Sequence, residues 1–370
     1  MNGQAVKMDF IPWAQPYIQA KEREYLARAL DSTWVSGGEF VNGFEKAFAE
    51  YHRKKFALST SNGTTSLLAA FLALKLGAGD EIILPGYCFL AAAHMAMHLG
   101  AKPVFAEVEP DTWCLSARAI EEKITTRTKL VVPVHTYGNI CDMEPILSLA
   151  REHDLIVLED AAEAFASRYK DCPAGSMGWA GSFSFQATKT ITTGEGGMVV
   201  TDNEELFKGM GLYRNHGMVS GTYFHEVAGH NFRLTNLQAA VGCAQLENLE
   251  EIIHQRRHIG ELYDSLLAEA PGIALQRFDK AVERVLWTCA LRLDPEAFPQ
   301  GRDQVIGQLR ERNIETRRGF VAPSLMPLYG CPPLPICEQI SRQVLCLPTY
   351  PGLTDEQIEY ASKVLLEIRR

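Results

Sequence analysis

Apolar residues in the middle of the chain alternate between short continuous runs and segments with helical spacing. The runs predict strands over 56–59, 81–84, 102–108, 130–135, 155–159, 181–185 and 197–201. The helical spacing predicts helices over 65–76, 91–99, 117–123, 143–153 and 204–215, most of them between two strands. Alternating strands and helices are typical of βαβ units, so we expect an α/β fold with a mostly parallel sheet and helices on both faces.

The two ends of the chain have a more helical pattern. A helix is predicted over 22–30, and after two glycines another follows over 40–51, while one long helical stretch covers 237–267. A chain of 370 residues exceeds the usual size of one small domain. We therefore expect a large α/β domain over 1–250, including the N-terminal lead-in, and a smaller α+β domain over 251–370.

Composition and charge narrow the function classes. The formal net charge of -9 argues against nonspecific nucleic-acid binding, which needs a basic surface. The nine cysteines are scattered and no pair has zinc-finger spacing, which fits a reducing compartment. The N-terminus has no apolar signal-peptide core, and no apolar run approaches the ~20 residues of a membrane span. We therefore expect a cytoplasmic protein that binds neither nucleic acid nor membrane.

Polar motifs follow several predicted strands, at the edge where open α/β sheets bind ligands. The first is SNGTTS from Ser61, at the start of a predicted helix. The free N–H groups and positive dipole end of a helix start bind phosphate, and Gly63 would let the ligand approach the backbone. A capped helix start without a ligand explains the same residues, because Ser, Asn and Thr are good N-caps.

Two further motifs carry titratable side chains. Asp160 ends an apolar strand, where its charge would keep a nearby pyridine nitrogen protonated, although an ion-paired or capping aspartate is the simpler alternative. FSFQATK ends at Lys189 and leads into the glycine-rich TTGEGG. A lysine in a desolvated pocket has a lowered pKa and becomes a Schiff-base nucleophile. A surface lysine is the alternative, but the hydroxyls of Ser184 and Thr188 beside it favour a binding site.

Two other patterns carry less information. GHNFRLT from Gly229 places an Asn and an Arg before the long helical stretch, where a helix cap explains them equally well. His94 and His98 have i, i+4 spacing but lack the glutamate of a zinc-protease motif. We therefore expect a core helix there and no metal site.

These motifs occur together and in order, and in combination they are very specific. They are WVSGG from Trp34, SNGTTSLLAA from Ser61, PVHTYGNICDM from Pro133, EDAAEA from Glu159, FSFQATKTITTGEGGMV from Phe183, RNHGM from Arg214 and GHNFRLTNLQAAVGCAQL from Gly229. Over almost its whole length the chain resembles the DegT/DnrJ/EryC1/StrS sugar aminotransferases. The resemblance implies the type I fold of pyridoxal-phosphate (PLP) aminotransferases, with a mixed, mostly parallel seven-stranded sheet, and PLP as the cofactor.

The resemblance also implies roles for single residues. Lys189 matches the lysine that holds PLP covalently, and Asp160 matches the partner of its ring nitrogen. Phe89 matches the aromatic residue that stacks on the ring, and Glu163 lies where many members carry Gln near the phenolic oxygen. The matched phosphate ligands are Gly63, Thr64, Ser184 and, from the second subunit of a homodimer, Asn231.

Within the family, EDAAEA, KTITTGEGGM and IETR from Ile314 are most similar to the perosamine synthases. This likeness implies that glutamate donates an amino group to a nucleotide-linked 4-keto-6-deoxyhexose, with GDP-4-keto-6-deoxymannose as the leading candidate. The predicted substrate contacts are Trp34, His135, Arg233, Arg317 and Ser324.

Three departures from the family pattern keep the sugar open. Cys88 replaces a usual Thr, His230 replaces a usual Phe or Tyr, and Ser324 stands where perosamine synthases carry His. A UDP- or dTDP-linked sugar, a 3-ketosugar or an inosose is therefore an alternative substrate. A PLP-dependent sugar dehydratase is a further alternative, but those relatives carry His at the position of Lys189. A PLP-binding regulator is another, and no basic segment supports it.

Overall fold

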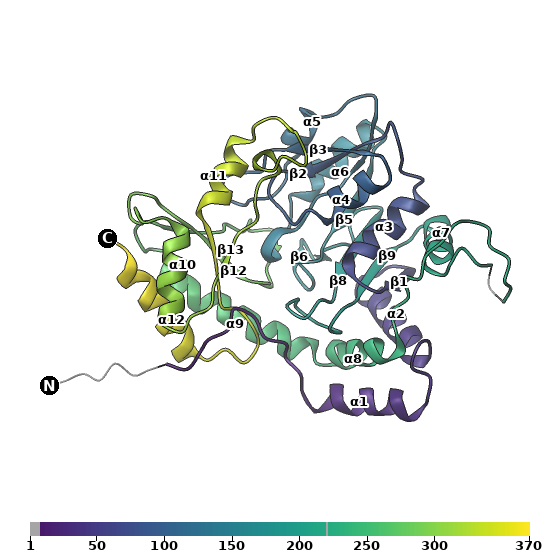
Figure 1. The fold of residues 1–370 in the computed structure, drawn as a ribbon, viewed down its shortest axis with the longest axis horizontal. Coiled ribbons are helices and arrows are strands. Elements are labelled where there is room, and N and C mark those ends of the chain that lie inside the picture. Colours follow the sequence, from purple (N-terminus) through teal and green to yellow (C-terminus); the bar gives the residue numbers. More distant parts are fainter. Residues whose placement is uncertain (1–7, 220) are drawn as a thin grey trace.

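The large sheet dominates the computed structural model, which describes residues 8–219 and 221–370 (Figure 1). Its seven strands follow the order β1-β9-β8-β5-β4-β2-β3. Their bounds are β1 Phe56–Thr60, β2 Glu81–Pro85, β3 Lys102–Ala106, β4 Thr128–Val131, β5 Ile156–Asp160, β8 Ala180–Ser184 and β9 Gly197–Thr201. β9 runs antiparallel to both neighbours and the other pairs are parallel. The predicted α/β class and the mixed, mostly parallel sheet are confirmed.

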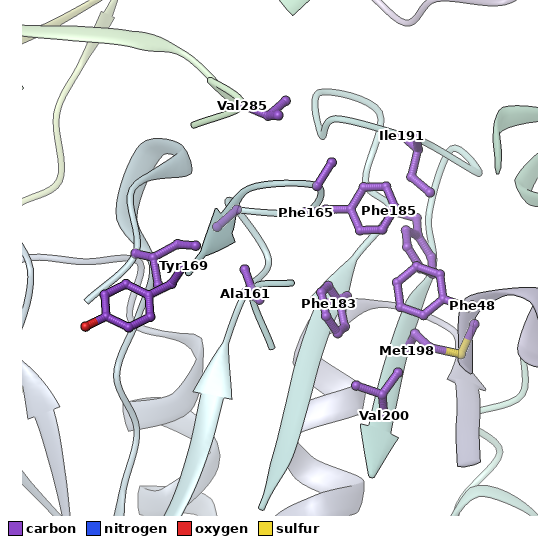
Figure 2. Close-up of a cluster of buried hydrophobic side chains, with 14 of the residues drawn as sticks. Phe48, Ala161, Phe165, Tyr169, Phe183, Phe185, Ile191, Met198, Val200 and Val285 are labelled. Atoms are coloured by element: carbon purple, nitrogen blue, oxygen red, sulfur yellow. The ribbon is translucent and has the colours of Figure 1, made fainter. Parts of the chain in front are cut away.

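Both faces of this sheet are buried, which explains why its strands have continuous apolar runs. Met198 and Val200 of β9 pack in one core cluster with Phe48 and Phe183, as Figure 2 shows. Val199, between them in the sequence, points into the cluster on the opposite face. The covering helices include α3 Gly63–Ala73, α4 Ala91–His98, α5 Ala117–Glu121, α6 Met143–Glu152 and α7 Glu204–Arg214.

Two N-terminal helices, α1 Ala20–Asp31 and α2 Glu39–Tyr51, pack against α8 Asn236–Glu247 (Figure 1). The expected single helical stretch over 237–267 is wrong in one respect, because α8 ends and α9 Leu249–Leu267 begins at Asn248. Asn248 has non-helical backbone angles (φ -96°, ψ 8°), and its side chain donates a hydrogen bond to Glu22 of α1 at 3.3 Å. This tertiary contact stabilises the break, and local apolar spacing does not reveal it.

The C-terminal part of the chain forms a second sheet. Its strands are all antiparallel, in the order β10-β12-β14-β13, and comprise β10 Ile273–Leu275, β12 Cys289–Leu293, β13 Arg317–Arg318 and β14 Val344–Leu347. Helices α10 Arg302–Glu311, α11 Pro335–Gln343 and α12 Asp355–Ile368 accompany it. A separate core cluster joins β12 and β14 to α9, α10 and α12. Two single-turn 3-10 helices complete the elements, η1 Thr136–Gly138 and η2 Pro323–Leu325.

A small third sheet connects the two predicted domains, and its short strands were not predicted. β11 Val282–Glu283 pairs with β6 Arg168–Tyr169, which pairs with β7 Cys172–Pro173. The domain boundary after residue 250 falls in the first turn of α9 and stays a prediction. No helix within residues 8–219 and 221–370 has both the length and the apolar character to span a membrane.

Candidate active site

A cavity of about 760 Å³ opens where β5 and β8 end and α3 begins. Seven of the predicted site residues line it: Gly63, Thr64, Phe89, Asp160, Glu163, Ser184 and Lys189. They lie at or shortly after the carboxyl ends of separate strands, and they meet because these ends share one edge of the sheet.

The start of α3 forms a cradle on one side of the cavity. Asn62 caps the helix, since its side-chain oxygen accepts a hydrogen bond from the Thr65 N–H at 2.9 Å. The N–H groups of Gly63 and Thr64 lie in the first turn, where a helix offers them no internal acceptor. A methyl group at Gly63 would lie 2.8 Å from the Cβ of Ser184, so a larger residue would force α3 and β8 apart. The cradle thus offers hydrogen-bond donors to an anion.

Lys189 lies opposite, on the loop after β8. Its Nζ is 3.8 Å from Glu163 Oε1 and 3.8 Å from the ring centroid of Trp287. Burial lowers the pKa of Lys189, and the nearby charges of Glu163 and Asp160 oppose that effect. A buried amine with a lowered pKa is neutral more often than an exposed lysine, which makes it a better nucleophile and base.

Two buried carboxyl groups face the same space. Asp160 accepts a hydrogen bond from the Ala162 N–H at 3.2 Å, and burial raises its pKa against the effect of Lys189. Glu163 accepts one from the Tyr137 N–H at 2.9 Å. Burial raises the pKa of Glu163 to about 7, although the charge of Lys189 lowers it. A cation placed beside Asp160 would therefore be strongly favoured, and Glu163 changes its charge near neutral pH.

The aromatic wall of the cavity is built from distant parts of the chain. Phe89 is 60% exposed, and its ring packs against that of Phe320, with 6.2 Å between the ring centroids. Trp13 meets Trp287 edge to face at 5.7 Å. The motifs did not identify Trp13, Trp287 or Phe320, because each lies in a segment without a local pattern and reaches the cavity only through the tertiary fold.

The five predicted substrate residues do not line this cavity, and their contacts with substrate stay predictions. The side chain of His135 is fully buried, with Nε2 2.9 Å from Glu159. Glu159 also accepts backbone N–H groups of Gly175, Met177 and Gly178. His135 thus belongs to a buried hydrogen-bond network that holds the loop after β7.

The other four lie at the surface or in a separate network. Trp34 is 70% exposed beyond α1, and Arg233 contacts Asn215 beside a second hollow of about 1210 Å³. Ser324 donates a hydrogen bond to Glu338 at 2.9 Å. Arg317 pairs with Glu315 at 2.8 Å and lies 5.7 Å from the ring of Trp13, which does line the cavity.

Asn231, the predicted phosphate ligand of a partner subunit, is exposed and lies outside the cavity of its own chain. It forms a bridge with Asn215 at the end of α7. The next residue, Phe232, accepts a hydrogen bond from the Ser61 N–H at 2.7 Å. The segment that carries Asn231 is therefore attached to the strand end that leads into the cradle.

A family model described as the DegT/DnrJ/EryC1/StrS aminotransferase family matches residues 16–365. The chain belongs to this family. GDP-perosamine synthase of Escherichia coli O157:H7 is 38% identical over 364 residues, which cover 97% of this chain and 99% of that protein. GDP-perosamine synthase of Caulobacter vibrioides is 41% identical, with 94% of this chain and 95% of that protein covered. Among solved structures, S. venezuelae DesV superposes on this chain with a TM-score of 0.91 at 32% sequence identity. The match covers 97% of this chain and 98% of that one.

This family member is a PLP-dependent aminotransferase, and its cavity fits that cofactor. The cradle between Gly63 and Ser184 has the donors for a phosphate group. Asp160 offers a buried carboxylate to a protonated ring nitrogen, and Lys189 offers a desolvated amine. The three features would bind three different chemical groups, namely a phosphate, a protonated ring nitrogen and a carbonyl carbon that an amine can attack. One PLP molecule carries all three groups.

Proposed function

We propose that the enzyme transfers an amino group from glutamate to C4 of a nucleotide-linked 4-keto-6-deoxyhexose, with GDP-4-keto-6-deoxymannose as the leading substrate. The observation that carries the proposal is the cavity in which the Lys189 amine, the Asp160 carboxyl and the Gly63 cradle face one another. The near full-length similarity to two GDP-perosamine synthases supports the choice of sugar. Its product would be an amino sugar.

In this proposal the cofactor residues divide the work by chemistry. The helix start at Gly63 and Thr64 and the hydroxyl of Ser184 bind the phosphate. Asp160 keeps the ring nitrogen protonated, and Phe89 covers the ring face. Bound PLP then supplies an electron sink for the negative charge that develops when a carbon next to nitrogen loses a proton.

Lys189 has two successive roles. Its Nζ would hold the cofactor covalently, and the amino group of glutamate would take over that bond and free the amine. The Nζ lies against Trp287 and Glu163, and burial lowers its pKa, which favours the neutral amine. As a general base, the neutral amine would take the Cα proton of glutamate, and as a general acid it would give a proton to the cofactor carbon bonded to the same nitrogen. Lys189 would move the proton in the opposite direction when the sugar substrate is aminated.

Glu163 gives the site its own pH dependence. Its carboxyl lies 3.8 Å from the Lys189 amine and titrates near neutral pH. When Glu163 is ionised it stabilises positive charge nearby, and when it is protonated it becomes a hydrogen-bond donor. A glutamine, which many family members carry here, stays neutral throughout.

We propose a homodimer with shared active sites. The support is the position of Asn231, which is exposed and does not line the cavity of its own chain. Mixing Lys189→Ala and Asn231→Ala chains tests it, because each mixed dimer would contain one site with both residues intact. Activity that returns on mixing two inactive variants supports the shared site, whereas an active monomer in sedimentation would contradict it.

The substrate itself is tested by an assay of glutamate-dependent amination. It compares GDP-, UDP- and dTDP-linked 4-keto-6-deoxyhexoses, a 3-ketosugar and an inosose. We expect the highest kcat/KM for the GDP-linked sugar. Exclusive reaction of the inosose or the 3-ketosugar would refute the proposed sugar and leave the aminotransferase chemistry in place. We place the enzyme in the cytoplasm, where nine unpaired cysteines remain reduced.

A further inference from the structure

Arg256 is a buried arginine on α9 that points toward the lysine loop rather than into solvent. Its side chain is 2% exposed, and its Nη1 donates to the carbonyl oxygens of Leu286 and Trp287 at 2.9 and 3.1 Å. Its Nη2 donates a longer hydrogen bond to the carbonyl oxygen of Lys189, at 3.4 Å. One guanidinium group therefore contacts the backbone of the proposed cofactor lysine and of the tryptophan that covers its amine.

No carboxylate offsets the charge of Arg256 in the described part of the chain. Burial lowers its pKa to about 10, with no charged neighbour acting on it, and its Nε has no hydrogen-bond partner there. The side chain therefore stays positive at neutral pH. A buried charge without a counter-ion is costly, and an apolar residue of similar size would usually pack there at no such cost. Plain filling of the core therefore does not explain Arg256.

Trp287 links Arg256 to the side chain of Lys189. The carbonyl oxygen of Trp287 accepts from Arg256, while its indole N–H donates to the Thr188 carbonyl at 2.8 Å. Its ring centroid lies 3.8 Å from Lys189 Nζ. An aromatic face at this distance stabilises a protonated amine. Arg256 thus holds both the backbone of Lys189 and the ring that covers its amine.

We propose that Arg256 is a positioning residue for Lys189, which keeps the indole of Trp287 over the amine and the amine in its reactive orientation. The inference rests on the proposed role of Lys189 as the lysine that holds PLP. A purely structural arginine would join α9 to residues 286 and 287 without any effect on the lysine. The two possibilities differ in whether the amine of Lys189 responds when Arg256 is changed.

The main test is Arg256→Lys, which keeps the charge but loses the planar fork that reaches three carbonyl groups. The first readout is the rate at which the PLP-free protein captures added PLP covalently, followed by visible absorbance across pH. Losing the indole face destabilises the protonated amine, so we expect the midpoint of this pH profile to fall by about 1 unit. In the PLP-loaded enzyme, we expect kcat to fall by about tenfold to a hundredfold with little change in the KM for glutamate.

The matched control is Arg257→Lys, at the next residue. Arg257 pairs with Glu283 at 2.6 Å on a partly exposed face. We expect wild-type capture and wild-type kcat from this control. Unfolding midpoints of both variants, measured at one protein concentration, separate an effect on the amine from a general loss of stability.

A second variant tests the positioning role even where Arg256→Lys lowers the stability of the protein. Trp287→Leu removes the aromatic face, so Arg256→Lys in that background should shift the capture midpoint no further. Additive shifts in the double variant, or a wild-type capture profile in Arg256→Lys, would overturn the positioning role. Failure of the lysine assignment is distinguishable, because covalent capture would then survive Lys189→Ala.

Discussion

A methyl group at Gly63 gives a sharp test of the phosphate cradle. In the structure, a Cβ at this residue lies 2.8 Å from the Cβ of Ser184 and 3.3 Å from the carbonyl oxygen of Phe183. Carbon atoms in contact are normally about 3.5–4.0 Å apart, so α3 and the end of β8 must separate by roughly 0.7–1.2 Å in Gly63→Ala. Neither side can yield cheaply, because Phe183 is fully buried and Ser184 pairs with β9.

The same displacement determines how much Gly63→Ala changes the free energy of unfolding and the affinity for the phosphate group. Forcing an extra methyl into such a contact costs about 1–3 kcal/mol, and replacing a helical glycine by alanine returns up to about 1 kcal/mol. We therefore expect the PLP-free protein to lose at most about 3 kcal/mol of its free energy of unfolding. A shift of this size also breaks one hydrogen bond to the phosphate, which weakens binding by about tenfold to a hundredfold.

Pyridoxamine phosphate is the appropriate probe, because it binds the cradle without a covalent bond to Lys189. Equilibrium titration of the PLP-free protein measures its Kd, and denaturant unfolding measures stability. Gly307→Ala in α10 is the matched control, since a Cβ there meets nothing within 4 Å. We expect it to raise stability by up to about 1 kcal/mol and to leave the Kd unchanged. Wild-type affinity in Gly63→Ala would show that the phosphate does not lie at the start of α3.

Three further predictions concern the titratable residues of the cavity. Lys189→Ala should abolish turnover while noncovalent PLP binding and the unfolding midpoint persist, and turnover above trace level would refute the role of this lysine. Asp160→Asn should lower the pKa of the cofactor ring nitrogen by about 1–3 units, measured from the pH dependence of the visible spectrum, whereas an unchanged spectrum would place the ring elsewhere. Glu163 ionises as the pH rises through about 7, so Glu163→Gln should match the wild type below that pH and lose the inflection near it in the rate of the glutamate half-reaction. An inflection that persists in the variant would assign it to another group.

The strands of the large sheet could be located because they are buried on both faces, although the predicted run over 130–135 shares only two residues with β4 Thr128–Val131. Such strands read as continuous apolar runs, and the runs over 56–59 and 197–201 coincide with β1 and β9 to within one residue at either end. The break at Asn248 could not be predicted, because it depends on a hydrogen bond to Glu22 in a helix more than 200 residues earlier. The two-residue strands of the third sheet have too few residues to show a period.

The same distinction applies to the site. Asp160 ends β5, Gly63 lies three residues after β1 and Lys189 lies five residues after β8, so the sheet links their motifs to their places in space. Trp13 and Trp287 reach the cavity from segments that no local pattern marks. His135 shows the opposite difficulty, because it lies in a matching motif but points into the core toward Glu159. A motif identifies a position along the backbone, but burial decides which way the side chain points.

PLP and the sugar nucleotide need different surroundings, which explains why the predicted substrate residues lie apart from the cofactor residues. PLP needs an anion cradle, a carboxylate and a lysine, and the strand ends of one chain supply all three. Phe89, Trp13 and Phe320 line the same cavity, and we propose that the sugar and its nucleotide enter past them and contact surface loops. Arg317 reaches that rim through Trp13, while Arg233 lies beside the segment of Asn231 that we assign to the partner's site. Changes at Arg317 should therefore act on the site of the same chain and changes at Arg233 on the neighbouring one, a difference that mixed dimers would reveal.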